Sequence, residues 1–417
     1  MKSHFPVVIV GGGQAGLSIS YCLKQKNIDN LIFEKNRIAH AWRSQRWDTF
    51  CLVTPNWQCT LPGHPYTGND PHGFMQRDQI VHYVESYADA FQPNIQEGVA
   101  VTRVRRLEAK RGFEITTSAG TYTADQVVVA TGGYHRPKVP RMAESLPKEI
   151  VQLHSSTYKS PEQLGDSLGR LRHRAVLVIG TGQSGCQIAE DLHLAGKQVH
   201  LCVGGAPRSP REYRGKDVVD WLDKMGYYDM PIDEHPQKES VRSKRNHYVT
   251  GRGGGREIDL RQFHLEGMQL YGKLKSIQGS HLTFHPDLTQ NLDQADEVAE
   301  SIKRTIDKYI EKHQIDAPPE PPYVPVWEPD SEPSDLDMQS ADIGTVIWCT
   351  GYHTDFSWIE IPVFDGRGYP SHERGVSVEG LYFIGLPWLY TWGSGRFSGV
   401  ARDAEHIADR IALRTKP

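Results

Sequence analysis

The chain has 417 residues and a formal net charge of −4, with 38% hydrophobic and 24% charged residues. This length allows two or three domains, and the slight excess of acid gives no general attraction to nucleic acid or to an anionic membrane. No apolar run approaches the roughly 18 residues that span a bilayer, and no apolar targeting segment precedes the first strand-like run. We therefore expect a cytoplasmic protein with no nucleic-acid or membrane partner. A homo-oligomer is left open.

A short β-branched run at residues 7–10 leads directly into glycines with the spacing G-x-G-x-x-G. The run is typical of a buried parallel strand, residues 15–26 have helical spacing, and residues 31–33 form a second strand that ends at Glu34. A glycine loop between strand and helix, followed about twenty residues later by an acid, is typical of a dinucleotide-binding unit. An ordinary tight turn is the alternative, which the combination of strand, helix and acid disfavours.

The spacing of this first glycine loop has a physical basis. One glycine permits the tight turn, the second lets the backbone approach a pyrophosphate, and the third lets the helix pack close to the strand. The helix N-terminus then offers free N–H groups to phosphates, and the acid accepts hydrogen bonds from ribose hydroxyls. The predicted binding residues are Gly11, Gly13, Gln14, Ala15, Gly16 and Glu34.

The same pattern recurs at residues 176–185, which read VLVIGTGQSG. A strand is expected over 175–179, a helix through about residue 195, and a next strand over 198–203. No acid stands where Glu34 stands in the first unit. This second glycine loop predicts a second dinucleotide site, with binding residues Gly180, Gly182, Gln183, Ser184 and Gly185.

Three arginines follow the second unit's next strand, namely Arg208, Arg211 and Arg214. An acid at this place suits a free ribose 2′-hydroxyl, whereas arginine accommodates a 2′-phosphate. We therefore expect NADPH at the second loop and a non-phosphorylated dinucleotide at the first. Arg208 and Arg211 are the chosen phosphate ligands, and a solvated basic loop is the alternative for any one of the three.

The six cysteines are scattered, and none forms a C-x-x-C pair. This argues against a disulfide framework, a zinc site and a redox-active dithiol. We expect no metal.

The order of motifs predicts an α/β fold with two Rossmann-like domains, the second inserted into the first. Residues 1–150 form the first part of one domain, and residues 151–340 form the inserted domain, with an insertion of its own at about 226–290. Residues 341–417 complete the first domain. Two similar strand exits, at Thr131-Gly132 and in the segment TVIWCTGY at 345–352, suggest where the chain crosses between domains.

The paired loops, the stretches ATGGYHRPKVP and WCTGY, and HSSTY at 154–158 resemble the flavin-containing monooxygenase superfamily. Within it, the chain is similar to the bacterial CzcO-like and plant YUCCA-like branch. PREYRGKDVVDWLDKMG and GRGGGREIDLRQF resemble a bacterial subgroup found in nitrilase-containing gene clusters. One fingerprint departs: Lys148 and Ile150 replace an aromatic residue and a glycine before His154. A structural role for His154 is therefore at least as well supported as a catalytic one.

The resemblance implies FAD at the first loop and roles for further residues. Lys35 would join Glu34 at the adenosine ribose, and the backbone of Val101 would meet adenine. Asn56 would hydrogen-bond a flavin or hydroperoxide oxygen, and capping a turn beside Pro55 is the alternative. The remaining predicted FAD contacts are Trp42, Arg43, Thr131, Gly132, Gly385 and Leu386.

The function implied is an NADPH-dependent FAD monooxygenase that uses O2. It would oxygenate a small nucleophilic substrate at nitrogen, sulfur or carbon through a C4a-hydroperoxyflavin. Such a cofactor carries the chemistry itself, so no protein nucleophile is required. Two alternatives stay open, namely an NADPH-dependent flavin oxidoreductase that reduces a non-oxygen acceptor and a flavin-binding redox sensor. The sensor is disfavoured because it has little use for a second dinucleotide site.

Overall fold

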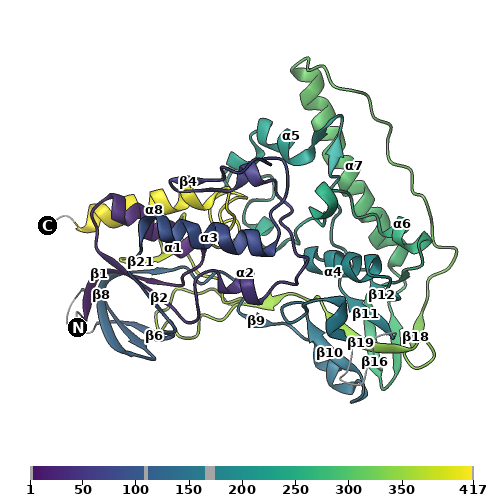
Figure 1. Ribbon diagram of the computed structural model, residues 1–417, viewed down its shortest axis with the longest axis horizontal. Helices are drawn as coiled ribbons and strands as arrows, with labels where there is room; N and C mark the ends of the chain where they lie inside the picture. Colours follow the sequence, from purple (N-terminus) through teal and green to yellow (C-terminus); the bar gives the residue numbers. More distant parts are fainter. Residues whose placement is uncertain (1–2, 108–110, 165–173, 416–417) are drawn as a thin grey trace.

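The computed structural model describes residues 3–107, 111–164 and 174–415, and its core consists of two separate β-sheets with helices packed on them (Figure 1). The first sheet has the order β5-β2-β1-β8-β7-β6, with β21 also paired to β8. Strands β5, β2, β1, β8 and β21 run parallel, while β6 and β7 form an antiparallel extension. Its strands are β1 His4–Val10, β2 Asn30–Glu34, β5 Ile95–Glu97, β6 Val101–Arg106, β7 Phe113–Thr117, β8 Gly120–Val129 and β21 Leu381–Phe383.

Helices cover one face of this first sheet. The buried apolar residues of α1, α3 and α8 form one cluster with those of the inner strands. On the opposite face, β6 to β8 pack against the segment 356–364. Since β1 and β2 are buried on both faces, they read as continuous apolar runs rather than as alternating ones. The helices are α1 Gln14–Gln25, α2 His40–Ser44, α3 Arg77–Phe91 and α8 Val400–Thr415.

The second sheet is fully parallel in the order β10-β19-β11-β12-β15. A three-stranded antiparallel sheet packs on one face, and α4 and α6 lie on the other. The strands are β10 Val151–His154, β11 Ala175–Ile179, β12 Val199–Cys202, β15 Gln269–Tyr271 and β19 Ile343–Trp348, with β16 Leu274–Gln278, β17 His281–Phe284 and β18 Asp335–Asp337 in the antiparallel sheet. The helices are α4 Gln183–Leu194, α5 Val218–Lys224, α6 Leu260–Leu265 and α7 Leu288–Lys312.

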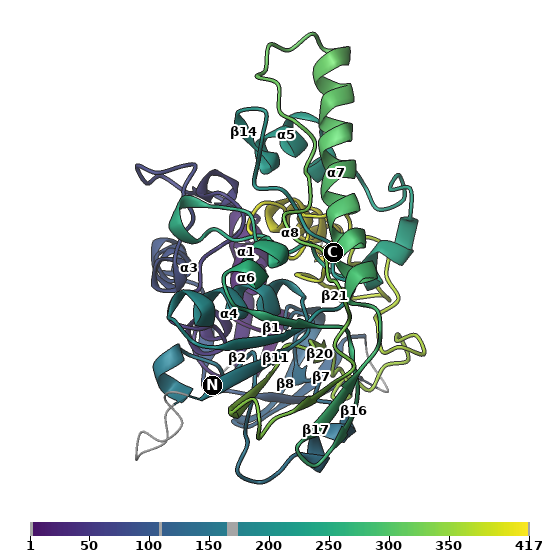
Figure 2. The same cartoon turned by 90° about the vertical axis from the view of Figure 1, so that its right-hand side faces the viewer.

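The long helix α7 projects away from both sheets, and α5 lies beside its outer part (Figures 1 and 2). Ile306 and Ile310 of α7 pack on Val218 and Trp221 of α5, which explains the apolar stripe along this otherwise charged helix. Residues 313–334 after α7 contain no helix or strand, in agreement with their proline-rich, acidic sequence. Short pairs of strands complete the fold: β3 Thr60–Leu61 with β4 His64–Pro65, β9 Arg136–Pro137 with β20 Tyr352–His353, and β13 Glu212–Tyr213 with β14 Lys216–Asp217.

The strand expected over 175–179 is confirmed at its bounds, and the other strands and helices expected around the two loops lie within a few residues of their predicted positions. One predicted boundary is wrong. The sequence places residues 341–417 in the returning part of the first domain, but β19 lies between β10 and β11 in the second sheet. The chain therefore leaves that sheet only after Cys349. The proposed insertion at 226–290 is also too broad, since β15 within it is the edge strand of the second sheet.

Candidate dinucleotide and substrate cavity

The first glycine loop joins β1 to α1. Gly11 has a φ of +112°, and a Cβ there would lie 2.7 Å from the carbonyl oxygen of Ala130. A Cβ on Gly16 would lie 1.9 Å from the carbonyl oxygen of Gly11, so only glycine lets the helix approach the strand. Gly13 is different, because a Cβ there meets no protein atom within 4 Å. Packing therefore explains the first and third glycines, and the second faces open space.

Glu34 at the end of β2 holds this loop in shape. Its carboxylate accepts hydrogen bonds from the backbone N–H of Gly12 at 2.7 Å and from that of Asn36 at 2.8 Å. The side chain is 9% exposed and still borders the cavity described below. It keeps acceptor capacity for a ligand hydroxyl, since a carboxylate offers about four lone-pair sites.

The second glycine loop joins β11 to α4 with the same construction. Gly180 has a φ of +105°, and a Cβ on Gly185 would lie 1.8 Å from the carbonyl oxygen of Gly180. A Cβ on Gly182 again meets nothing within 4 Å. Here the strand end is closed by Thr181, whose hydroxyl accepts from the N–H of Gly204 at 2.9 Å and donates to its carbonyl oxygen at 3.0 Å.

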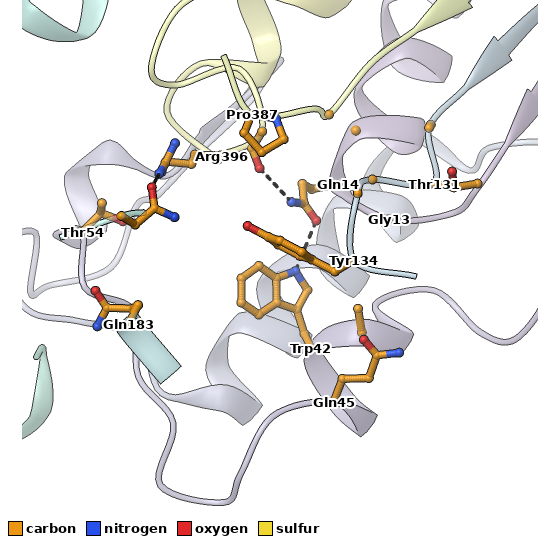
Figure 3. Close-up of a pocket in the computed structure, with 18 of the residues that line it drawn as sticks. Gly13, Gln14, Trp42, Gln45, Thr54, Thr131, Tyr134, Gln183, Pro387 and Arg396 are labelled. Atoms are coloured by element: carbon orange, nitrogen blue, oxygen red, sulfur yellow. Dashed lines mark hydrogen bonds between the residues drawn. The ribbon is translucent and has the colours of Figure 1, made fainter. Parts of the chain in front are cut away.

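A cavity of about 890 Å³ extends from the first glycine loop to the helices α5 and α7 and to the start of α4. Figure 3 shows Trp42 and Tyr134 on one side of it, with Arg396, Thr54 and Gln183 around the rest. The Trp42 indole N–H donates to Gln14 at 3.2 Å, and its ring stacks on Phe397. Many predicted FAD and NADPH contacts border this cavity: Gly11, Gly13, Gln14, Ala15, Glu34, Lys35, Trp42, Val101, Thr131, Gly132, Gln183, Arg211 and Gly385.

Several predicted site residues do not border the cavity. Gly16, Gly180, Gly182, Ser184 and Gly185 belong to the loops but lie outside its lining. Arg43 points to Glu85, with which it forms an ion pair, and Arg46 borders the cavity instead. Leu386 is 3% exposed and packs in the core beneath the first sheet. The contact predicted for the side chain of Arg43 is therefore not supported. At Leu386 the resemblance implies contact through backbone groups, and this stays a prediction.

The catalytic role predicted for Asn56 is also not supported. Its amide nitrogen donates to the carbonyl oxygen of Asp70 at 2.9 Å, and its amide oxygen accepts from the backbone N–H of Met75 at 2.8 Å. The side chain is 4% exposed and does not border the cavity. Asn56 joins two parts of the 50–76 segment. This role is structural, but it is not the cap of a turn beside Pro55 considered from the sequence, because the short 3-10 helix Asn56–Gln58 has no side-chain cap hydrogen bond.

The phosphate contact predicted for Arg208 needs the clearest correction. This side chain is 2% exposed and lies within 3.6 Å of Glu257, 3.4 Å of Asp259 and 3.1 Å of Asp296. These carboxylates raise the pKa of the guanidinium against the effect of burial. Three acids around one arginine leave no role for a phosphate, because like charges would oppose its approach.

The other two arginines of this stretch are also held by protein groups. Arg211 borders the cavity, but it donates to the carbonyl oxygen of Val53 at 2.9 Å and to Asp217 at 2.9 Å. Arg214 pairs with Asp307 at 2.9 Å. The exposed cation beside the end of β12 is instead Arg245, whose Nη1 lies 3.6 Å from the position of a Cβ built on Gly205. No sequence pattern connects Arg245 with this strand, since some forty residues separate them.

His154 has a structural position. Its ring bonds the Ser156 hydroxyl at 2.9 Å and the Gly351 carbonyl oxygen at 3.0 Å, so it links the exits of β10 and β19. Burial lowers the pKa of this imidazole.

The known proteins to which this chain is similar are all oxidoreductases. Residues 8–251 match the pyridine nucleotide-disulphide oxidoreductase family. The chain is 34% identical over 416 residues to an uncharacterized oxidoreductase, CzcO-like, of Geobacillus kaustophilus (strain HTA426), covering 99% of both chains. It is 33% identical over 220 residues to the indole-3-pyruvate monooxygenase YUCCA6 of Arabidopsis thaliana, covering half of each. Its fold is similar to that of a flavin-containing monooxygenase from Stenotrophomonas maltophilia, at 17% identity, 99% coverage of both chains and a TM-score of 0.65.

These matches confirm the predicted resemblance and the prediction of a flavin-dependent oxidoreductase. They agree with a mixed α/β fold of this class. In the part of the chain that the structure describes, no helix is both long and apolar enough to cross a membrane.

Proposed function

The chain belongs to the pyridine nucleotide-disulphide oxidoreductase family, and from this premise we propose that it is an NADPH-dependent FAD monooxygenase. Its similarity to the monooxygenase YUCCA6 over half of each chain supports the proposal. Its substrate is a small molecule that accepts oxygen at nitrogen, sulfur or carbon. The observation that carries the proposal is the single cavity, which runs from Gly13 of the first glycine loop to Gln183 of the second. Gln183 is the second loop's one predicted residue among those described at the cavity, and a dinucleotide bound there would reach the same space as one bound at the first loop.

The residues around the first glycine loop fit FAD. The open space at Gly13 is where a pyrophosphate would approach the backbone. The Thr131 hydroxyl oxygen borders the cavity, is buried, and has no hydrogen-bond partner among the described residues. A buried polar atom without a partner costs free energy unless a ligand satisfies it. Glu34 and Lys35 would hold the adenosine ribose, Val101 the adenine, and Thr131, Gly132 and Gly385 the part nearer the flavin ring.

The second glycine loop fits NADPH. Gly182 leaves the same open space at the N-terminus of α4, where the helix dipole favours phosphate. No acid stands at the end of β12, and Arg245 places a cation there. No ion pair of Arg245 is found among the described residues, so it is a better 2′-phosphate ligand than Arg208.

FAD, when bound, would supply the redox chemistry between NADPH and O2. The chain itself would bind and orient both dinucleotides and keep water from the reacting atoms. Trp42 and Trp392, which are partly buried, provide aromatic walls for that purpose, and the exposed Tyr134 borders the same cavity.

The cysteines favour oxygen transfer over disulfide reduction. All six are buried and free, and burial raises the pKa of the Cys22, Cys51, Cys59, Cys186, Cys202 and Cys349 thiols. A buried thiol with a raised pKa is a poor nucleophile. The alternative is an oxidoreductase that passes electrons to a non-oxygen acceptor. It is kept because Asn56, the side chain expected to assist oxygen transfer, does not reach the cavity.

Isotope labelling separates the two functions. The holoenzyme is incubated with NADPH, 18O2 and a panel of small amines, sulfides, ketones and organic acids. A monooxygenase places one 18O atom in a product and couples it to NADPH consumption. If NADPH is consumed only in the presence of an artificial electron acceptor, and no product carries 18O, the electron-transferring alternative is correct.

A further inference from the structure

The part of the cavity remote from the first glycine loop is built mainly from apolar side chains. Val218 and Leu222 from α5, Met225 directly after it, Ile302 from α7, and the rings of Tyr228 and Trp392 border it. Tyr228 and Trp392 pack on each other with ring centroids 4.6 Å apart. Among the described lining residues, this part of the cavity contains no aspartate or glutamate. We call it the outer chamber.

One cation without an acidic partner stands at this chamber. Arg396 lies over the Trp392 ring, with its guanidinium carbon 3.8 Å from the ring centroid. Its Nη1 donates to the Trp392 carbonyl oxygen at 2.5 Å and its Nη2 to the Asn246 side-chain oxygen at 3.1 Å. No carboxylate pairs with it among the described residues, whereas Arg208, Arg211, Arg214, Arg252 and Arg261 all have one.

The groups that face Arg396 are neutral. Burial lowers the pKa of its guanidinium, and the ionisable groups near it are Tyr134, Tyr227 and Tyr228. His247 borders the same cavity, and burial lowers the pKa of its imidazole to about 4, so it is uncharged near neutral pH. Arg396 itself stays cationic, because a guanidinium is not deprotonated in proteins. A partly desolvated cation without a counter-charge is costly unless a ligand supplies the charge.

The direction of Arg396 separates it from the first glycine loop. Gly395, the preceding residue, accepts a hydrogen bond from the Gln14 side chain at 3.4 Å, which anchors the backbone to α1. The guanidinium leads away from that anchor to Trp392 and Asn246, and Figure 3 shows it across the cavity from Trp42. It is therefore placed for a molecule in the outer chamber rather than for the FAD pyrophosphate near Gly13.

We propose that the outer chamber binds an organic anion, whose carboxylate or similar head group pairs with Arg396 and whose aromatic or aliphatic body packs against α5, α7 and Trp392. The ligand is the substrate if the proposed function is correct, and in that respect the inference rests on it. An ammonium substrate is disfavoured, because Arg396 would repel it and no acid in the chamber would attract it. A flat guanidinium that is already stacked on an aromatic ring is well suited to a planar carboxylate.

The test measures binding and not turnover. Oxidised holoenzyme, without NADPH, is titrated with 4-phenylbutanoate, 4-phenylbutanamide and 4-phenylbutylamine, and the flavin absorbance and tryptophan fluorescence are followed. We expect the acid to bind about ten- to a hundredfold more tightly than the amide, as a charge-assisted contact implies. The amine should bind most weakly.

Variants assign the effect to the residue. Arg396→Gln should remove the preference for acid over amide, and Arg396→Lys should keep the preference at reduced affinity. Arg304→Gln is the matched control, because Arg304 lies on the exposed side of α7 and pairs with Glu297. It should leave the preference unchanged. If Arg396→Gln is unstable, the Arg396→Lys result and the wild-type acid-to-amide ratio still decide.

Three results would overturn the inference. They are equal binding of acid and amide by the wild-type protein, an acid preference that persists in Arg396→Gln, or a loss confined to NADP+ binding, which would make Arg396 a coenzyme residue. None of these bears on whether 18O enters a product. Conversely, absence of 18O transfer with an intact, Arg396-dependent acid preference would reject the proposed function and leave the anion site standing.

Discussion

The two glycine loops have the same backbone design but are closed by different groups. In the first, a carboxylate from the next strand, that of Glu34, accepts the loop's own N–H at Gly12. In the second, the loop residue Thr181 reaches across to the strand end and bonds both backbone groups of Gly204. The shape of the loop can therefore be kept without an acid. The absence of that acid frees the second site for a more negative ligand, and Arg245 adds a positive charge beside it.

The largest effect is expected where the two loops are alike. Gly16→Ala and Gly185→Ala would each place a Cβ less than 2 Å from a carbonyl oxygen. Overpacking against backbone should lower the free energy of unfolding by about 3 kcal/mol. Urea denaturation of the apoprotein measures this. Gly13→Ala and Gly182→Ala, whose added carbon meets no protein atom, are the matched controls and should cost about 1 kcal/mol or less. Equal losses in all four variants would contradict the packing account.

The next effect contrasts two buried carboxylates, Asp403 in the helix α8 and Glu190 in the helix α4. Asp403 has no ion pair among the described residues, and burial raises the pKa of its carboxyl group to about 6, against the lowering effect of the Ser394 side chain and of Arg374 and Arg402. The Glu190 carboxylate forms an ion pair with Arg256, whose Nη2 lies 2.9 Å from Oε1 of Glu190. Because the pKa of Asp403 is higher in the folded state, its contribution to stability is present below about pH 4 and is lost as the pH rises through about 6.

Asp403→Asn should therefore raise the free energy of unfolding at pH 8 by about 2 kcal/mol, with little change at pH 4. Denaturation at the two pH values measures this. Glu190→Gln should give no comparable gain, since it also removes the partner of Arg256. A gain for Asp403→Asn that is equally large at both pH values would show that ionisation is not its cause.

Arg245→Gln tests whether the positive charge beside the second loop selects NADPH over NADH. Loss of a charge-assisted phosphate contact should weaken NADPH binding by about 2 kcal/mol and leave NADH binding nearly unchanged. The rates of flavin reduction against each coenzyme concentration measure this selectivity. Lys244→Gln removes a neighbouring exposed cation and is the control. If Arg208→Gln, rather than Arg245→Gln, alters the NADPH-to-NADH ratio, the structural reassignment is wrong.

The smallest effect concerns Glu34. Glu34→Gln keeps one acceptor oxygen for Gly12 but removes the charge, so FAD affinity should fall by about 1 kcal/mol. Equilibrium dialysis of the apoprotein with FAD gives the constant. NADPH reduction of the FAD that remains bound should keep its coenzyme dependence. A change in NADPH dependence with normal FAD affinity would reverse the assignment of the loops.

The sequence predicts the strands and glycine loops better than it predicts where individual side chains point. The strand at 175–179 and the glycine loops follow from local periodicity and spacing. The position of β19 does not, because its neighbours β10 and β11 lie far away in sequence and a strand carries no mark of its partner. Arg208 and Asn56 looked accessible by their places in the chain, yet their partners Asp296 and Met75 come from other segments.

Arg396 and Arg245 were missed for a related reason. Each lies in an irregular segment and reaches its site only after the chain has folded back on itself. Arg396 stands alone among aromatic and glycine residues in TWGSGRFSG, and Arg245 is one of several basic residues in RSKRNHY. Neither pattern specifies a ligand without the cavity that the fold creates.

The assignment of FAD to the first loop and NADPH to the second is the central claim, and anaerobic titration with NADPH tests it most directly. Wild-type protein should carry about one FAD per chain and be bleached by NADPH. Gly182→Ala should stay yellow but require more NADPH, whereas Gly13→Ala should be purified with little flavin. A wild-type protein without flavin, or a Gly13→Ala variant that keeps its flavin while Gly182→Ala loses it, would contradict the assignment.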